Sequence, residues 1–184
     1  MALTPSSMLA LGTQAPDFKL MDTLTGKTYN LEVAKGSKAT VIMFICNHCP
    51  YVKHVIPELV RLAKDYQAKD IGFVAISAND VTGYPEDAPE KMTQLARQLG
   101  FSFPYLYDEI QSTAKAYQAT CTPDFFIFDK DLLCIYRGQL DGSRPGNKTA
   151  VTGKDIRAAL DNILQGKPVN PQQIPSMGCN IKWK

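Results

Sequence analysis

The feature that most constrains the fold of this chain is a change from a buried strand to an amphipathic helix within a few residues. Val41–Ile45 is an unbroken apolar run of strand length, which is typical of a strand buried on both faces. From Pro50 onward the apolar residues recur at helical spacing, until the pattern ends at Lys69-Asp70. Between the two segments lies Cys46-Asn47-His48-Cys49. The sequence therefore predicts a strand, a loop with two cysteines and a helix, in that order.

The rest of the chain alternates between strands and helices. A second helix is expected from Asp87 to Gly100, because Asp87-Ala88-Pro89-Glu90 has the spacing of a capping box. The other expected elements are a strand at Ile71–Ser77, an extended segment at Phe103–Tyr107, a short helix at Ile110–Tyr117, a hairpin of Phe125–Asp129 and Leu132–Gln139, and a helix at Thr152–Leu164. This order predicts an α/β fold with a mixed central sheet flanked by helices. We expect residues 1–184 to form one domain, with an irregular C-terminal tail at 168–184.

Length and charge narrow the classes of function. With 184 residues, 45% of them apolar, the chain can bury one ordinary core. Its 20 basic and 18 acidic residues are interspersed and leave a formal charge of only +2, so no basic stripe indicates a nucleic-acid or membrane surface. The expected partners are therefore proteins or small molecules.

The N-terminus and the cysteines point to one compartment. Met1–Phe18 lacks a basic region followed by an apolar stretch, and nowhere do about 18 apolar residues run together. We therefore expect a cytoplasmic protein. Because the cytosol keeps thiols reduced, five cysteines indicate catalytic, metal-binding or buried sulfur rather than structural disulfides.

Four motifs, in this order, resemble those of a known family. They are Gly12–Phe18, similar to G-x-x-A-P-D-F; the Cys46–Cys49 loop; Phe103–Asp108; and Thr122–Asp129, similar to T-P-x-x-F-x-x-D. The chain resembles the thioredoxin-like fold of the AhpC/TSA (peroxiredoxin-like) group over nearly its whole length. The resemblance implies thiol redox chemistry without a bound cofactor. It also implies a cis peptide bond at Thr122-Pro123, whose backbone would pair with an extended substrate lying across the redox cysteine.

The spacing makes Cys49, rather than Cys46, the candidate nucleophile. The thioredoxin pattern F-W-A-E-W-C-G-P-C-K-M-I-A-P aligns without a gap on Phe44–Pro57 and places Cys49 at the first redox cysteine. Proline is favoured at the first helical position, so Cys49 should cap the helix, where unpaired amides favour a thiolate. Lys53, one turn further on, would also lower the pKa of Cys49. Cys46 is then the expected resolving thiol, which closes the disulfide and releases the partner.

For three of the other candidate site residues the sequence leaves two roles open, one functional and one purely structural. His48 either stabilises the thiolate, as the histidine of a C-x-H-C motif does, or is an ordinary loop residue. Cys121 is either a third thiol within reach of Cys49 or a filler in a crowded loop. Cys179 could fold back as a resolving thiol, or the tail could simply cover an apolar patch. Cys134 is expected to be buried packing.

Three functions remain in competition. The first is thiol–disulfide exchange with protein or small-molecule partners through Cys49 and Cys46. The second is a hydroperoxide-reducing thiol peroxidase, resolved by Cys46, Cys121 or Cys179. Against it, neither cysteine register supplies the hydroxyl of P-x-x-x-[TS]-x-x-C. Arg137 is a candidate for the family's activating arginine, but arginines on strands are usually solvated or salt-bridged. The third is a copper or zinc site, which lacks a second CxxC and a distant histidine.

Overall fold

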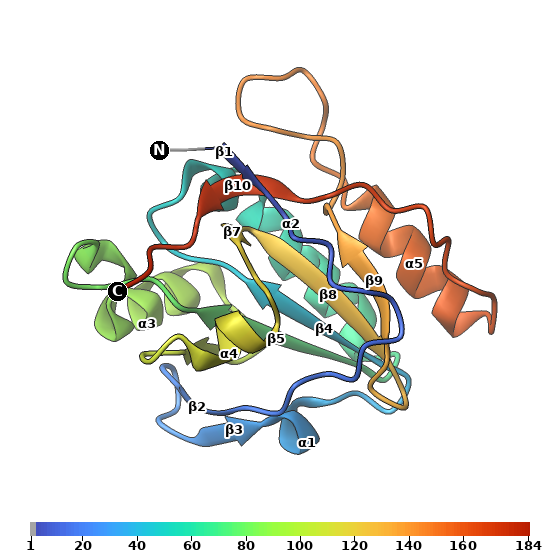
Figure 1. The fold of residues 1–184 in the computed structure, drawn as a ribbon, viewed down its shortest axis with the longest axis horizontal. Coiled ribbons are helices and arrows are strands. Elements are labelled where there is room, and N and C mark those ends of the chain that lie inside the picture. The colour runs from blue at the N-terminus through green and yellow to red at the C-terminus, as the bar shows by residue number, and fades with distance from the viewer. Residues whose placement is uncertain (1–2) are drawn as a thin grey trace.

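The computed structural model describes residues 3–184, and a mixed sheet lies at its centre (Figure 1). Among these residues, seven strands form this sheet in the order β3-β2-β6-β5-β4-β8-β9. They are β2 (Lys19–Asp22), β3 (Thr28–Asn30), β4 (Ala39–Phe44), β5 (Ile71–Ser77), β6 (Tyr105–Tyr107), β8 (Asp124–Asp129) and β9 (Cys134–Gly138). The strands β4, β5 and β6 are parallel, whereas β2, β3, β8 and β9 each pair antiparallel with their neighbours. The predicted mixed sheet and the β8–β9 hairpin are confirmed.

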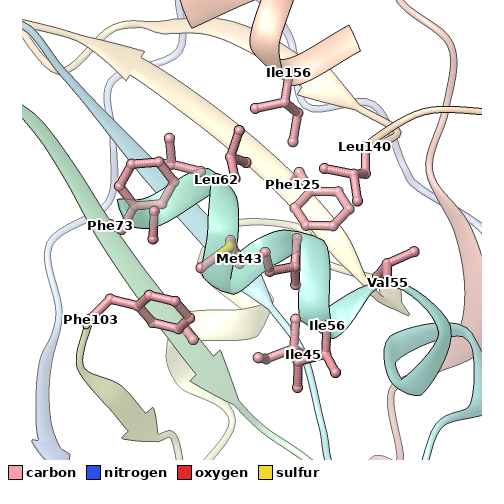
Figure 2. Packing of buried hydrophobic residues seen from close by; sticks show 14 of the residues in the cluster. Met43, Ile45, Val55, Ile56, Leu62, Phe73, Phe103, Phe125, Leu140 and Ile156 are labelled. Atoms are coloured by element: carbon pink, nitrogen blue, oxygen red, sulfur yellow. The ribbon is translucent and has the colours of Figure 1, made fainter. Parts of the chain in front are cut away.

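Helices cover both faces of this sheet and create two cores. They are α1 (Leu31–Ala34), α2 (Pro50–Gln67), α3 (Pro89–Leu99), α4 (Ser112–Ala116), α5 (Lys154–Leu164) and the 3-10 helix η1 (Pro85–Asp87). Successive residues of β4, and Ile45 directly after it, alternate between the cores. Met43 and Ile45 lie with side chains of α2 and α5 (Figure 2) in the core that α3 also lines, whereas Ile42 and Phe44 pack with side chains of α1 and α4. This double burial explains why the run Val41–Ile45 is apolar at every position.

A second, smaller sheet covers the beginning of α2. It consists of β1 (Leu3–Pro5), β10 (Met177–Asn180) and β7 (Cys121–Thr122), all antiparallel, with β10 in the middle. In Figure 1 the C-terminal segment runs back across the molecule to reach this position. The tail predicted as irregular therefore contains a strand, which the four residues Met-Gly-Cys-Asn do not reveal by pattern.

The predicted capping box is wrong. Helix α3 begins at Pro89, its N-cap is Ala88, and no side chain caps it. The Asp87 carboxylate is already occupied by long-range hydrogen bonds to the cysteine loop. None of the helices formed by residues 3–184 combines the length and apolar composition needed to cross a bilayer.

Candidate active site

Cys49 lies where the chain leaves β4 and enters α2. It is the N-cap of α2, with φ −65° and ψ 123°, and Pro50 is the first helical residue, as the sequence predicted. Proline fits there because its missing N–H would have no partner within the helix. The Cys49 side chain is 0% exposed, and the backbone N–H of Val52 in the first turn is directed to its sulfur. The helix thus presents a donor to a sulfur that water does not reach.

The pKa of Cys49 is lowered to about 5, and several hydrogen bonds are responsible. The largest contribution is the hydrogen bond from the Cys46 thiol, and the Cys179 thiol and the Val52 amide lower the pKa further. Burial acts in the opposite direction. Cys49 is therefore a thiolate at neutral pH, with two other thiols as its principal donors.

Cys46 remains a protonated thiol. Burial is the main cause that raises its pKa well above the ordinary value, and the hydrogen bond to Cys49 adds to this effect. Its sulfur lies 3.4 Å from Thr122 Oγ1 and 3.8 Å from His48 Nδ1. The two cysteines of the loop thus have opposite protonation states.

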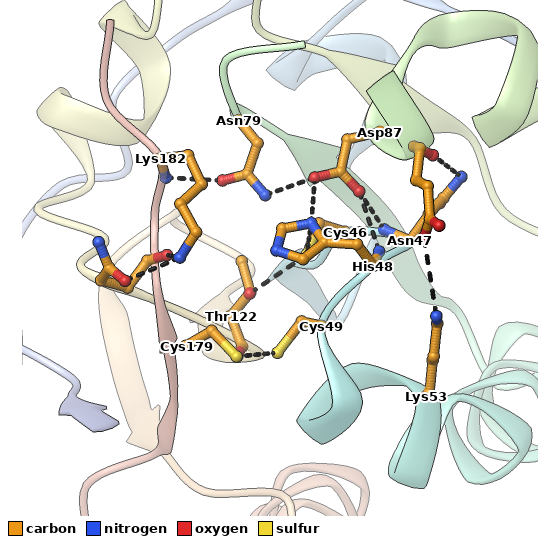
Figure 3. Close-up of polar contacts among 12 residues, drawn as sticks. Cys46, Asn47, His48, Cys49, Lys53, Asn79, Asp87, Thr122, Cys179 and Lys182 are labelled. Carbon is orange, nitrogen blue, oxygen red and sulfur yellow. Dashed lines mark hydrogen bonds and ion pairs between the residues drawn. The ribbon is translucent and has the colours of Figure 1, made fainter. Parts of the chain in front are cut away.

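Asp87 holds the cysteine loop in place from across the sequence. Its Oδ1 accepts the backbone N–H groups of Asn47 at 2.8 Å and His48 at 3.0 Å. Its Oδ2 lies 2.5 Å from His48 Nδ1 and accepts a hydrogen bond from Asn79 Nδ2 at 2.8 Å. Figure 3 shows this carboxylate between Asn79 and the loop. The loop conformation between the two cysteines therefore depends on one buried side chain.

The His48 ring is fixed between Asp87 and Tyr84. It stacks on the Tyr84 ring with centroids 4.7 Å apart. Its Nε2 is buried and has no hydrogen-bond partner among residues 3–184. The ring is thus oriented by Nδ1 and by stacking, and the same Nδ1 lies 3.8 Å from the Cys46 sulfur.

The strands β7 and β10 form the side of the site that faces the cysteine loop. The Thr122-Pro123 peptide bond is cis, and the Thr122 carbonyl oxygen lies 3.3 Å from Cys49 Sγ. Opposite Thr122 in the strand register lies Cys179 of β10. Its sulfur is only 2.8 Å from Cys49 Sγ (Figure 3). Cys179 therefore belongs to the site, in contrast to the alternative in which the tail only covers an apolar patch.

Lys53 does not contribute as expected. Its Nζ lies 3.8 Å from Glu86 Oε2, and the side chains are 61% and 69% exposed. A solvent-exposed ion pair of this kind has little effect on a buried group. The low pKa of Cys49 therefore depends on its hydrogen bonds.

The other sequence candidates lie outside the immediate contacts of Cys49. Cys121 is buried, its sulfur is directed to the carbonyl of Pro123 at 3.6 Å, and burial raises its pKa. Cys134 is buried in the second core, as expected. Arg137 donates to the carbonyl oxygen of Leu9 and to the side chain of Gln173. These bonds direct the guanidinium to Leu9 and Gln173, and the cysteine on which its charge acts is Cys134, whose pKa it lowers against the larger effect of burial.

Three side chains of the site could serve as metal ligands. The Cys46 sulfur, a His48 ring nitrogen and an Asp87 oxygen lie within 4.8 Å of one another. However, His48 Nδ1 and Asp87 Oδ2 already bond to each other, so a metal ion would have to replace that interaction. Zinc also prefers a fourth ligand. These contacts favour thiol chemistry at the site over metal binding.

Sequence reasoning misses Asp87 as a site residue and leaves the role of Cys179 open. Asp87 is 39 residues from His48, and its position before a helix predicts a cap instead; Cys179 is 130 residues from Cys49. The presence of a cysteine in the tail is the only signal for Cys179. For Asp87 the sequence contained no signal, because an isolated aspartate before a helix has a common local explanation.

Comparison with known families and structures agrees with this geometry. Residues 11–136 match the AhpC/TSA family, and the chain belongs to that family. A search of curated proteins gave no match. The family, together with the thioredoxin-like fold, supports a thiol redox function and places the protein among the oxidoreductases.

Two solved structures are similar over almost the whole chain. An uncharacterized conserved protein from Geobacillus kaustophilus is 60% identical, with a TM-score of 0.99, over 100% of this chain and 97% of that one. A hypothetical protein from Sinorhizobium meliloti 1021 is 45% identical, with a TM-score of 0.96, over 98% of each chain. The thioredoxin domain of a thiol-disulfide oxidoreductase from Bacteroides vulgatus shares the fold alone, at 18% identity and a TM-score of 0.59, over 74% of this chain and 90% of that one.

Proposed function

We propose that the protein is a thiol–disulfide oxidoreductase in which Cys49 attacks and Cys46 is the second thiol of the redox pair. This proposal rests on the difference in pKa between the two thiols. The pKa of Cys49 is lowered to about 5, whereas burial raises that of Cys46. Since the thiolate is the nucleophile in disulfide exchange, Cys49 is the reactive sulfur at neutral pH and Cys46 holds a proton.

The reaction follows from these protonation states. The Cys49 thiolate attacks one sulfur of a substrate disulfide, a new S–S bond forms, and the leaving thiolate takes a proton. The Cys46 thiol then loses its proton and attacks Cys49 Sγ, which releases the second substrate thiol. The substrate gains two electrons and two protons, and the pair ends as a Cys46–Cys49 disulfide. The loss of charge on Cys49 in the intermediate removes one cause of the raised pKa of Cys46.

Thr122 and Pro123 are the proposed substrate-binding residues. The carbonyl of Thr122 lies beside the Cys49 sulfur, so a backbone paired at this edge would bring its own sulfur near the thiolate. Extended substrates bind to strand edges in this manner, and at this edge a substrate strand would have to take the place of β10. The partners we propose are therefore small or protein disulfides.

Exchange with hydroxyethyl disulfide, a small neutral probe, tests the roles. The reduced protein should lose two thiols per chain reversibly, and Cys49→Ser should lose none. Cys46→Ser should retain the first attack on the probe, and Cys134→Ala, in the second core, should behave as the unaltered protein. If Cys46→Ser abolished the attack while Cys49→Ser still formed mixed disulfides, the assignment of the nucleophile would be wrong.

Thiol peroxidase activity is a second candidate, because one observation favours it. The hydroxyl of Thr122 lies 3.4 Å from the sulfur of Cys46, the thiol beside the proposed nucleophile, so β7 brings into the site a hydroxyl that the local motif lacks. The Cys49 thiolate would attack a hydroperoxide oxygen, give an alcohol and a Cys49 sulfenic acid, and release water when Cys46 attacks. Consumption of hydrogen peroxide that Thr122→Val slows more than Thr120→Val would favour this function, and no consumption by the unaltered protein would eliminate it.

A further inference from the structure

The strand β10 occupies the edge beside the cis-proline, where an extended substrate would pair. Cys179 lies opposite Thr122, and Asn180 lies opposite Cys121, in an antiparallel register. On its other side β10 pairs with β1, so that Leu3 lies opposite Cys179. The segment is also fixed at both ends, by Ser176 Oγ donating to the carbonyl of Pro123 at 2.6 Å and by Lys182 N donating to Asn79 Oδ1 at 2.8 Å. The chain thus supplies its own extended segment at this edge.

Gly178 allows this segment to approach unusually closely. A Cβ at this position would lie 1.9 Å from the Thr122 carbonyl oxygen, so every residue other than glycine would push β10 away. The next residue is Cys179, whose sulfur reaches within 2.8 Å of Cys49 Sγ. The combination of a glycine and a cysteine therefore places a thiol against the nucleophile through backbone pairing.

This arrangement also controls access to the nucleophile. Both cysteines of the loop are buried, at 0% exposure for Cys49 and 1% for Cys46. The thiol of Cys179 donates to the Cys49 thiolate, and burial together with this bond raises the pKa of Cys179 to about 12. A protein disulfide could reach Cys49 only if β10 moved, whereas the sulfur of Cys179 is already in contact.

We propose, building on the proposed function, that β10 is an internal substrate strand and that Cys179 forms a disulfide with Cys49 as an alternative to Cys46. After Cys49 has formed a mixed disulfide with a substrate, the Cys179 thiol loses its proton and attacks Cys49 Sγ. The bond between Cys49 and the substrate breaks, and the substrate leaves as a thiol. The substrate disulfide is reduced by two electrons, and Cys49 and Cys179 are oxidised. In this form the C-terminal segment is covalently closed over the site.

Peptide mapping after oxidation by hydroxyethyl disulfide distinguishes the two pairings. Trypsin cuts after Lys38 and Lys53, so Cys46 and Cys49 share peptide 39–53, whereas Cys179 lies in peptide 158–182. Remaining thiols are blocked with N-ethylmaleimide before digestion. In the unaltered protein we expect peptide 39–53 joined to 158–182, in addition to an internal link within 39–53.

Two variants make the test sharp. Cys46→Ser should give the joined peptides and no lasting adduct, whereas Cys46→Ser/Cys179→Ser should retain the hydroxyethanethiol adduct on Cys49. Cys46→Ser/Cys134→Ala is the matched control and should behave as Cys46→Ser. The role of Cys179 would be overturned if Cys46→Ser kept a lasting adduct while its Cys179 was alkylated, and if the unaltered protein gave no joined peptides. That result would leave the proposed function intact. Absence of any adduct on Cys49 in the double variant would instead overturn the proposed function.

Discussion

Cys49 differs from the other four cysteines of the chain in its donors, not in its burial. All five are buried, and burial alone raises a thiol pKa, as it does for Cys121 and Cys134. Only Cys49 receives hydrogen bonds from two thiols and a helix amide, and these lower its pKa. At the scale of the residue, reactivity therefore depends on how many donors converge on one sulfur.

Replacement of Asp87 by asparagine should destabilise the cysteine loop. The carboxylate interacts with four donor groups, and an amide must place its own N–H₂ against at least one of them. An unsatisfied buried donor costs about 1–3 kcal/mol, so the free energy of unfolding in urea should fall by roughly that amount. Exchange at Cys49 should slow as well. Glu86→Gln, at the exposed neighbour, should change neither quantity, and equal effects of both variants would contradict the assignment.

The site residues that could be predicted are those with local causes. Cys49 could be predicted as the helix N-cap because the next residue, Pro50, is of the type favoured at the first helical position. Cys179 and Asp87 reach the site from distant parts of the chain, and nothing in their neighbours specifies that contact. Lys53 is a residue that the sequence wrongly assigns to the site. Its helical spacing predicts a position near Cys49, but its side chain pairs with Glu86 of η1 instead.

At the scale of elements, β10 fills an edge that β7 would otherwise expose. Short strands at sheet edges carry unpaired backbone groups, and a covering segment removes that liability. Here β10 is paired on both sides, by β1 and by β7. Its position makes the C-terminal segment part of the site rather than an appendage.

Substitution of Gly178 by alanine should displace β10 from β7. The new methyl group would lie 1.9 Å from the Thr122 carbonyl oxygen, and overpacking of this kind costs about 1–3 kcal/mol. Modification of Cys49 by N-ethylmaleimide should become faster because the strand that covers it moves. Gly142→Ala is the control, since its Cβ would meet no atom within 4 Å. If the two variants reacted at the same rate as the unaltered protein, β10 would not limit access.

The central elements were predictable and the small sheet was not. The continuous apolar runs at β4 and β5 and the helical period of α2 are clear in the sequence, because both cores select apolar side chains at defined positions. The strands β1, β7 and β10 are two to four residues long and exist only because distant segments pair. Sequence periodicity contains no information on such pairings.

At the scale of the whole molecule, the buried carboxylate of Asp124 couples stability to pH. It lies in β8 and is 0% exposed, and the Ser6 hydroxyl and the backbone N–H groups of Thr120 and Phe125 compensate only in part for its burial. Burial raises its pKa from 3.8 to about 7. The folded protein therefore holds a proton that the unfolded chain releases at lower pH, so the contribution to stability is complete below about pH 4 and is lost as the pH rises to 7.

The variant Asp124→Asn should remove this part of the pH dependence. At about 1.4 kcal/mol per pH unit, the unaltered protein should lose roughly 4 kcal/mol relative to the variant between pH 4 and 7. Urea unfolding at several pH values measures the difference. Asp131→Asn, an exposed site in the hairpin turn, should follow the unaltered protein, and a constant difference between Asp124→Asn and the unaltered protein across this range would contradict the prediction.

The most direct test of the account is the ionisation of Cys49 in the folded, reduced protein. The ultraviolet absorbance of the thiolate, taken as the difference between the unaltered protein and Cys49→Ser, reports this group without requiring a reagent to enter the site. We predict a transition near pH 5, with the thiolate fully present at neutral pH. A midpoint near the ordinary thiol value of about 8.5 would contradict the central claim that converging hydrogen bonds hold this sulfur ionised.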